Sequence, residues 1–225
     1  MLVVISNPKA VADEVIIINA LFDEGLEVLH LRKPDYGKDE IRSLMEKIKP
    51  QYYKQIALHQ HHELADDFGI NRLHYTEANR KATEGQPQGI APTSTGCRGR
   101  VYPCPGLHVG IEGLENHDYI LSTSIHNVED YKKLSSSFAY TFFGPVFDSI
   151  SKVGYTSSLS DDFVFPVEPG LPKVIAIGGI DPANIQRAKE MKFDGAAALG
   201  TIWRQPANSV SQFKALQKAW EQAGR

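Results

Sequence analysis

The chain alternates short runs of β-forming residues with stretches of helical periodicity, and this alternation limits its fold more than any other feature. In the stretch 38–48, Ile41, Leu44 and Ile48 recur at the spacing of one helix face. Strands that alternate with helices predict βαβ crossovers and a parallel sheet. Strands are predicted at 2–6, 27–31, 55–59, 72–75, 119–122, 140–143, 173–177 and 195–199, and helices at 11–24, 38–48, 63–68, 128–134, 182–191 and 210–223.

Eight strand candidates in 225 residues favour a (β/α)₈ TIM barrel over a doubly wound sheet. No GxGxxG motif follows the first strand, so a dinucleotide-binding fold loses its main support. We expect one TIM-barrel domain over residues 1–225. Residues 78–118 are too long for a routine connection and predict either an elaborated segment after strand four or a disordered insertion. Residues 147–170 predict a long loop on the face where barrels carry their active sites.

The charge and the apolar runs exclude several classes of protein. A formal net charge of −3 argues against a nucleic-acid-binding protein, which usually has a basic face. No apolar run approaches the roughly 20 residues of a membrane span. Residues 1–6 lack the features of a signal peptide, so we expect a cytoplasmic protein with no membrane partner. Cys97 and Cys104 are expected to be free thiols, because no further ligands stand at zinc-site spacing.

Two neighbouring turns predict a phosphate site. Gly178 and Gly179 end the seventh predicted strand just before a helix, and Gly200 and Thr201 follow the eighth strand. Glycine lets backbone N–H groups approach a ligand, and a helix N-terminus favours an anion. Barrels often bind phosphate in the loops after strands seven and eight. The alternative is a pair of tight turns without a ligand.

Polar residues after the sixth and second strands are further candidates for anion binding. Ser149, Ser151 and Lys152 offer two hydroxyl groups and an ammonium group, although a solvated loop would have the same composition. Strand alternation places His30 and Arg32 on one face, with Lys33 at the strand edge. A cation at a strand end facing the barrel mouth suits a phosphate or diphosphate, and a surface arginine is the alternative.

The fifth predicted strand brings Ser124 and His126 to a common face. His126 could transfer protons near neutral pH, although a single histidine is more often a structural, hydrogen-bonded residue.

Together these segments resemble the thiamine phosphate synthase/TenI family of (β/α)₈ barrels. The similarity runs through HLRK, SIHNVED, FFGPVFDSISK, VIAIGGI and GAAALGTIW. The resemblance implies small-molecule phosphate substrates and either of two reactions. Synthases join a pyrimidine methyl diphosphate to thiazole phosphate with Mg²⁺ and release diphosphate, whereas TenI-like relatives isomerise a thiazole carboxylate phosphate without metal. Whether the chain forms a homo-oligomer is left open.

The resemblance implies substrate-binding roles for Arg32, for the serines and lysine of 149–152, and for the two glycine turns. It also implies that His126, Lys152 and Ser124 are catalytic. Lys33 and His59 are added as substrate-binding candidates: Lys33 stands close to the family lysine, which is Pro34 here, and its side chain is expected to point elsewhere.

The chain departs from the family at the metal-binding positions. His30 stands for a glutamine, and His59-Gln60 for Asn-Asp. Asn79 replaces the second metal-binding aspartate. Mg²⁺ prefers anionic oxygen ligands, so no metal ligand is assigned and Mg²⁺ stays a possible cofactor whose family ligands are missing. His59, His30 and Lys33 could supply part of the lost positive charge, and Glu77 one carboxylate.

Three functions remain open on these residues. The first is thiamine phosphate synthesis with altered diphosphate binding. The second is metal-independent thiazole tautomerisation with His126 moving the proton. The third is non-catalytic binding of a thiazole phosphate, with a transition-metal site among His59, His61, His62 and His74 as a minor possibility, because imidazole suits Zn or Ni.

Overall fold

The computed structural model describes residues 1–84, 119–148, 159–160 and 162–222, and its parallel strands close into a barrel. Each strand pairs in parallel with the next one, and the eighth returns to the first through Val3 and Ala197. All eight predicted strands are confirmed, and with them the TIM barrel. The strands are β1 (Leu2–Ile5), β2 (Val28–Leu31), β3 (Ile56–Leu58), β4 (Arg72–Tyr75), β5 (Ile120–Ile125), β6 (Phe138–Phe143), β7 (Lys173–Ile177) and β8 (Gly195–Ala198).

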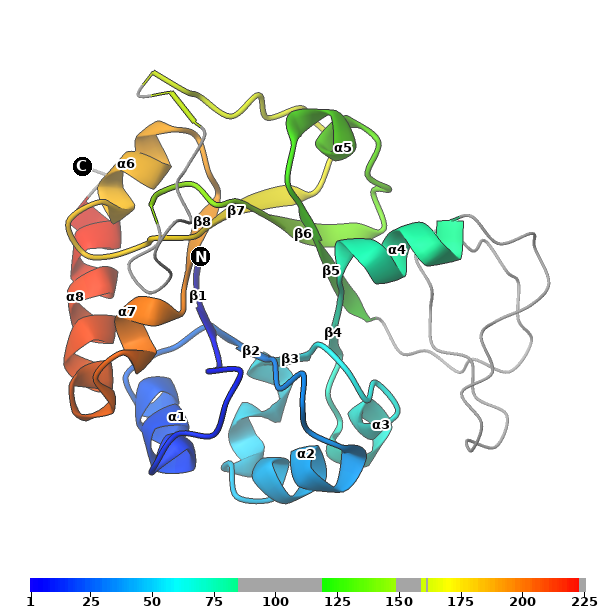
Figure 1. Cartoon of the computed structure of the whole chain (residues 1–225), viewed down its shortest axis with the longest axis vertical. Helices are drawn as coiled ribbons and strands as arrows, with labels where there is room; N and C mark the ends of the chain where they lie inside the picture. The colour runs from blue at the N-terminus through cyan, green and yellow to red at the C-terminus, as the bar shows by residue number, and fades with distance from the viewer. Residues whose placement is uncertain (85–118, 149–158, 161, 223–225) are drawn as a thin grey trace.

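Helices surround the barrel and cover its outer side (Figure 1). They are α1 (Glu14–Asp23), α2 (Lys38–Met45), α3 (Leu64–Phe68), α4 (Glu77–Glu84), α5 (Val128–Lys132), α6 (Ile185–Glu190), α7 (Gly200–Trp203) and α8 (Ser209–Gln222), with 3₁₀ turns η1 (Pro50–Gln55) and η2 (Pro206–Asn208). None of these helices is long and apolar enough to cross a membrane.

Several predicted boundaries were wrong: α2 ends at Met45 rather than at residue 48, α6 begins at Ile185 rather than at residue 182, and β5 ends at Ile125 rather than at residue 122. Helix α1 begins at Glu14 rather than at residue 11, because Asp13 adopts a left-handed φ of 57° that a helix cannot continue. Helix α4 extends into the stretch 78–118, which agrees with an elaborated segment after strand four. The remainder of that stretch, 85–118, lies outside the described residues.

Strand alternation divides the core into two layers. The outer layer lies between barrel and helices and contains Val4, Leu29 and Leu58. The inner layer fills the barrel with Val3, Ile5, Val28, Ala57, Tyr140, Phe142, Ile175 and Ala197.

The strand register adds polar side chains to the inner layer. His30 is paired with Ala57, and His74 with Ser122, which is paired in turn with Tyr140. Paired residues of parallel strands point to the same side, so these side chains also face the barrel interior. Because all strands run in parallel, the residues that follow them meet at one end, here called the barrel mouth.

Candidate active site

Arg32 stands at the barrel mouth directly after β2, with an exposed side chain. Its backbone is fixed to the end of β1: the Arg32 amide donates to Ser6 Oγ at 2.8 Å, and Ser6 Oγ lies 3.1 Å from the Arg32 carbonyl oxygen. The guanidinium group is therefore carried by a rigid strand end and is accessible to an anionic ligand.

Lys33, the next residue, points in a different direction. Its ammonium group is fully buried, contacts the Glu14 carboxylate at 2.6 Å and donates to the Lys9 carbonyl at 2.9 Å. Burial raises the pKa of the Glu14 carboxyl, and the hydrogen bond from Lys33 opposes that rise. The expected divergence of this side chain from Arg32 is confirmed, and substrate binding by Lys33 stays a prediction.

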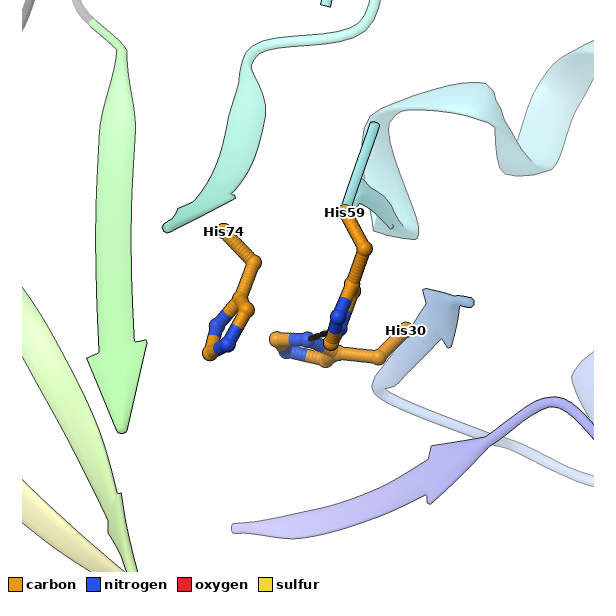
Figure 2. Close-up of side chains that lie close together, drawn as sticks. All are labelled: His30, His59 and His74. Atoms are coloured by element: carbon orange, nitrogen blue, oxygen red, sulfur yellow. Dashed lines mark hydrogen bonds between the residues drawn. The ribbon is translucent and has the colours of Figure 1, made fainter. Parts of the chain in front are cut away.

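Three histidines converge below the mouth, inside the barrel (Figure 2). His30 comes from β2, His59 directly follows β3 and His74 comes from β4. His30 Nδ1 lies 2.9 Å from His59 Nε2, and the His59 and His74 rings stack with centroids 4.0 Å apart. All three are buried, with His59 the most accessible at 9% exposure. We call His30, His59 and His74 the histidine cluster.

Other interior side chains contact the outer edges of this cluster. His30 Nε2 lies 2.7 Å from the hydroxyl of Tyr140. His74 Nδ1 lies 3.0 Å from Ser122 Oγ, and His74 Nε2 lies 3.2 Å from Ser124 Oγ. The cluster is thus the centre of a hydrogen-bonded polar network in an otherwise apolar interior.

Burial keeps the cluster uncharged near neutral pH. It lowers the pKa of His30 and His59 well below the ordinary histidine value, and the pKa of His74 to about 3. Repulsion between protonated rings would lower the pKa values of His30 and His59 further, with His74 acting on both. The expectation that His30 and His59 replace lost positive charge is therefore wrong, because desolvation favours their neutral forms.

His61 and His62 do not join the cluster. His61 Nε2 lies 3.0 Å from the Tyr36 carbonyl, and His62 Nε2 lies 3.0 Å from the Leu58 carbonyl. Of the four histidines considered for a transition-metal site, the structure brings together His59 and His74 and adds His30.

Ser124 and His126 end β5 on the side of the mouth opposite β1. Ser124 is half-buried against His74, whereas the His126 side chain is 64% exposed. His126 Nδ1 is 2.9 Å from the Gly144 carbonyl, and its Nε2 is 3.6 Å from Glu77 Oε2. The two contacts hold the ring between β6 and the start of α4, with one nitrogen beside a carboxylate.

The turn after β7 requires its two glycines. Gly178 and Gly179 have φ values of 99° and 64°. A Cβ on Gly178 would lie 2.8 Å from Pro145 Cα, and one on Gly179 would overlap the Asp148 carbonyl oxygen. Both residues therefore allow close backbone packing as well as positive φ.

The turn after β8 is bonded to the turn after β7. The Thr201 hydroxyl donates to the Ile180 carbonyl, and Gly200 begins helix α7 beside it. A surface hollow lined by Asp181, Thr201 and Arg204 adjoins the two turns. The residues predicted to bind phosphate on these strands therefore lie together.

The segment after β6 is fixed to the turn after β7. The amide of Val146 donates to the Ile177 carbonyl at 2.9 Å, and that of Phe147 to the Gly178 carbonyl at 3.1 Å. This attachment extends to Asp148, immediately before Ser149 in the sequence. Ser149, Ser151 and Lys152 lie outside the described residues.

The positions of the family's metal-binding aspartates do not fit Mg²⁺ bound by carboxylates. The Gln60 side-chain amide donates to the Lys33 carbonyl, and Asn79 lies exposed on α4. Both side chains are neutral, whereas Mg²⁺ is usually held by one or two carboxylates. Glu77 is the nearby carboxylate, and it faces His126.

Sequence reasoning missed two contacts. Tyr140 was assigned to a strand without a role, although its alternation with Phe142 could have placed it in the interior. The Lys33–Glu14 pair joins residues 19 positions apart. It depends on how α1 packs against β2, which no local pattern reveals.

The comparisons with known proteins agree with this architecture. Residues 102–202 match the family model described as thiamine monophosphate synthase. The thiamine-phosphate synthase of Clostridium tetani (strain Massachusetts / E88) is 30% identical over 106 residues, which cover 43% of this chain and 51% of the relative. The match thus spans about half the length of that curated relative.

Two solved structures resemble the whole chain. Thiamine phosphate pyrophosphorylase from Bacteroides thetaiotaomicron has a TM-score of 0.66 and 24% identity, and the match covers 98% of this chain and 97% of that one. The enzyme of the same name from Pyrococcus furiosus has a TM-score of 0.67 and 16% identity, covering 99% and 96%. At these identities the likeness shows the fold, and it confirms the TIM barrel.

Proposed function

We propose, from the chain's similarity to the thiamine phosphate synthase/TenI family, that it is a thiamine phosphate synthase-type transferase with altered diphosphate binding. In this reaction the pyrimidine methyl carbon leaves its diphosphate and forms a bond to the nitrogen of thiazole phosphate, and diphosphate is released. One observation supports the proposal most: hydrogen bonds join the turn after β7 to the turn after β8 and to the segment after β6.

The phosphate of the thiazole substrate fits these turns. Gly178 and Gly179 let the turn pack closely against the segment after β6, and backbone N–H groups at such glycine turns bind anions. In the sequence, Ser149, Ser151 and Lys152 follow directly after this segment. These residues would add hydroxyl and ammonium donors to the phosphate or diphosphate groups.

Arg32 is the residue we assign to the leaving diphosphate. It projects from the end of β2, which only β1 separates from β8, and an arginine can contact two phosphate oxygens at once. Negative charge builds up on the diphosphate as its bond to carbon breaks, and a fixed cation stabilises that charge. No step is assigned to Mg²⁺, because the described residues at the family positions do not fit it.

The test is synthesis of thiamine phosphate from both substrates, measured with Mg²⁺ and with a chelator. We expect product in both conditions. Arg32→Gln should lower the rate by about 10- to 100-fold, because one charged contact to the leaving group is worth roughly 1.5–3 kcal/mol. The control is Arg42→Gln, which removes an arginine paired with Asp67 on the outer helices and should leave the rate unchanged. Absence of product in both conditions would reject the transferase.

A second candidate is the metal-independent thiazole tautomerase, and the His126–Glu77 contact favours it. An imidazole fixed at Nδ1 and facing a carboxylate at Nε2 is able to accept and return a proton. His126→Ala should then slow tautomerisation by about 10²- to 10⁴-fold, the usual contribution of a general acid–base group. A full rate in this variant would exclude that role.

The third candidate, a binder of thiazole phosphate, would show calorimetric binding without turnover of any of these substrates. The single domain, the cytoplasmic location, the absence of nucleic-acid partners and a homo-oligomeric state stay predictions.

A further inference from the structure

We propose that His30, His59 and His74 form a binding site for a divalent transition-metal ion such as Zn²⁺. The inference goes beyond the proposed function and does not depend on it. One nitrogen from each ring lies within 4.8 Å of the others. At zinc–nitrogen bonds of 2.0–2.1 Å, tetrahedral ligand atoms stand about 3.4 Å apart. His30 Nδ1 and His59 Nε2, at 2.9 Å, already lie near that spacing.

The donor atoms suit this class of metal. Imidazole nitrogen binds Zn, Cu, Ni and Fe well, and Mg²⁺ poorly. A histidine binds a metal through the lone pair of its neutral ring, and all three rings are buried. Two of the ligands lie on strands and the third directly follows one, so the barrel backbone holds their Cα atoms in place.

Two of the rings also have the outer contacts that liganding histidines usually have. A metal-bound imidazole commonly donates its second N–H to a nearby oxygen, which fixes its orientation. His30 Nε2 has the Tyr140 hydroxyl at 2.7 Å for this purpose. His74 has Ser122 Oγ at 3.0 Å and Ser124 Oγ at 3.2 Å, one at each nitrogen. Either nitrogen of His74 can therefore turn to the metal while the other keeps a serine partner.

Metal binding requires a defined rearrangement. The His59 and His74 rings now stack with 25° between their planes, so their in-plane lone pairs do not converge on one point. One ring must rotate. The hydrogen now shared by His30 Nδ1 and His59 Nε2 must also transfer to the other nitrogen of its ring. His59 lies at the mouth end of the cluster and is the most exposed of the three, so an ion would enter past it.

Three protein ligands leave the fourth position of a tetrahedral ion open. Sites with three histidines and one open position usually bind a water molecule or a ligand there. Substrate entering the mouth would reach this position from the side of His59 and Ser124.

The experiment is titration of the metal-free full-length protein with Co²⁺, followed by its visible d–d absorption, and then displacement with Zn²⁺. We expect one equivalent per chain, intense tetrahedral-type bands and displacement by Zn²⁺. Mg²⁺ should not compete. Octahedral-type bands, or saturation at much less than one equivalent, would overturn the proposal.

Two variants test whether Co²⁺ binds at the buried histidine cluster rather than at histidines elsewhere on the protein. His59→Asn should weaken Co²⁺ binding by at least 100-fold, and Tyr140→Phe, which removes an outer contact, by about 10-fold. His61→Asn is the matched control, because His61 is two residues away and bonds the Tyr36 carbonyl instead. Equal binding in the His59 and His61 variants would overturn the proposal.

A second measurement tests the site if the His59→Asn variant does not fold. Zn²⁺ should raise the unfolding temperature of the unmodified protein and a chelator should reverse the rise, because an ion that binds only the folded chain stabilises it. The same rise should remain in His61→Asn. An unfolding temperature that Zn²⁺ leaves unchanged would count against the site.

Discussion

The two sides of the barrel mouth differ in what their strands carry. On the side of β5 to β8, the strand ends are glycine turns, hydroxyl groups and an exposed histidine, joined by backbone hydrogen bonds. On the side of β2 to β4, they are the exposed Arg32, buried neutral imidazoles and a lysine paired with Glu14. The family-model match, residues 102–202, contains all of β5 to β8 and none of β1 to β4.

This difference suggests that the two halves of the site can change independently. The phosphate binding that we propose at the β7 and β8 turns would use backbone groups of adjacent strands, and it would not need the side chains of β2 and β3. Metal-assisted diphosphate binding needs particular carboxylates, and here Gln60 and Asn79 occupy those positions. At positions 30 and 59, imidazoles stand where the family resemblance implies amides, and they build the histidine cluster.

We expect the largest loss of stability from breaking the Lys33–Glu14 ion pair. Lys33→Met leaves the Glu14 carboxylate buried without its partner, which should lower the free energy of unfolding by about 3–5 kcal/mol. The double variant Lys33→Met/Glu14→Leu should recover most of that loss, because both charges are removed. Urea unfolding measures both. If Lys33→Met left the stability unchanged and lost affinity for substrate, Lys33 would be a substrate ligand. Its pairing with Glu14 would then not distinguish the two sides of the mouth.

A steric test on the phosphate side should give the next largest effect. Gly179→Ala introduces a Cβ that overlaps the Asp148 carbonyl at a φ of 64°, and it should cost about 3 kcal/mol of unfolding free energy. Gly69 has the same φ with no atom near its missing Cβ, so Gly69→Ala should cost only about 1 kcal/mol. Equal losses in the two variants would show that the β7 turn is not tightly packed.

Acid should destabilise the metal-free protein through the histidine cluster. The pKa of His74 is about 3 when folded and near 6.5 when unfolded. The unfolded chain therefore binds the extra proton first, and stability falls as the pH drops below 6.5. For His74 alone the loss by pH 5 is about 2 kcal/mol. His74→Asn should reduce the pH 7-to-5 difference by that amount, and His61→Asn should not; an identical pH dependence in all three proteins would contradict a buried, neutral His74.

We expect the smallest loss of stability from removing the contact between the turns after β7 and β8. Thr201→Val removes the hydroxyl that bonds the Ile180 carbonyl and should lower the unfolding free energy by about 1 kcal/mol. If the turns bind thiazole phosphate, its affinity should fall by roughly fivefold in calorimetry. Ser211→Ala is the control, because it removes a hydroxyl on α8 that donates to the Asn208 carbonyl in η2. If Thr201→Val lost stability but bound thiazole phosphate with unchanged affinity, the turn would not be part of the binding site.

The sequence predicts the barrel well because each strand is a short apolar run that local periodicity identifies. It predicts the grouping of Gly178, Gly179 and Thr201 for the same reason, since adjacent parallel strands bring their ends together. The charge of the site was harder to predict. His30 and His59 looked like cations, and only their burial shows them to be neutral. The partner of Lys33 likewise depends on packing between α1 and β2.

We propose that the β7 and β8 side of the mouth binds phosphate and that the β2 to β4 side does not use Mg²⁺. Calorimetric titration of thiazole phosphate and of inorganic diphosphate, each with Mg²⁺ and with a chelator, tests it most directly. The account predicts that thiazole phosphate binds equally in both conditions and that Mg²⁺ does not strengthen diphosphate binding. Diphosphate binding strengthened tenfold or more by Mg²⁺, or no binding of thiazole phosphate, would contradict it.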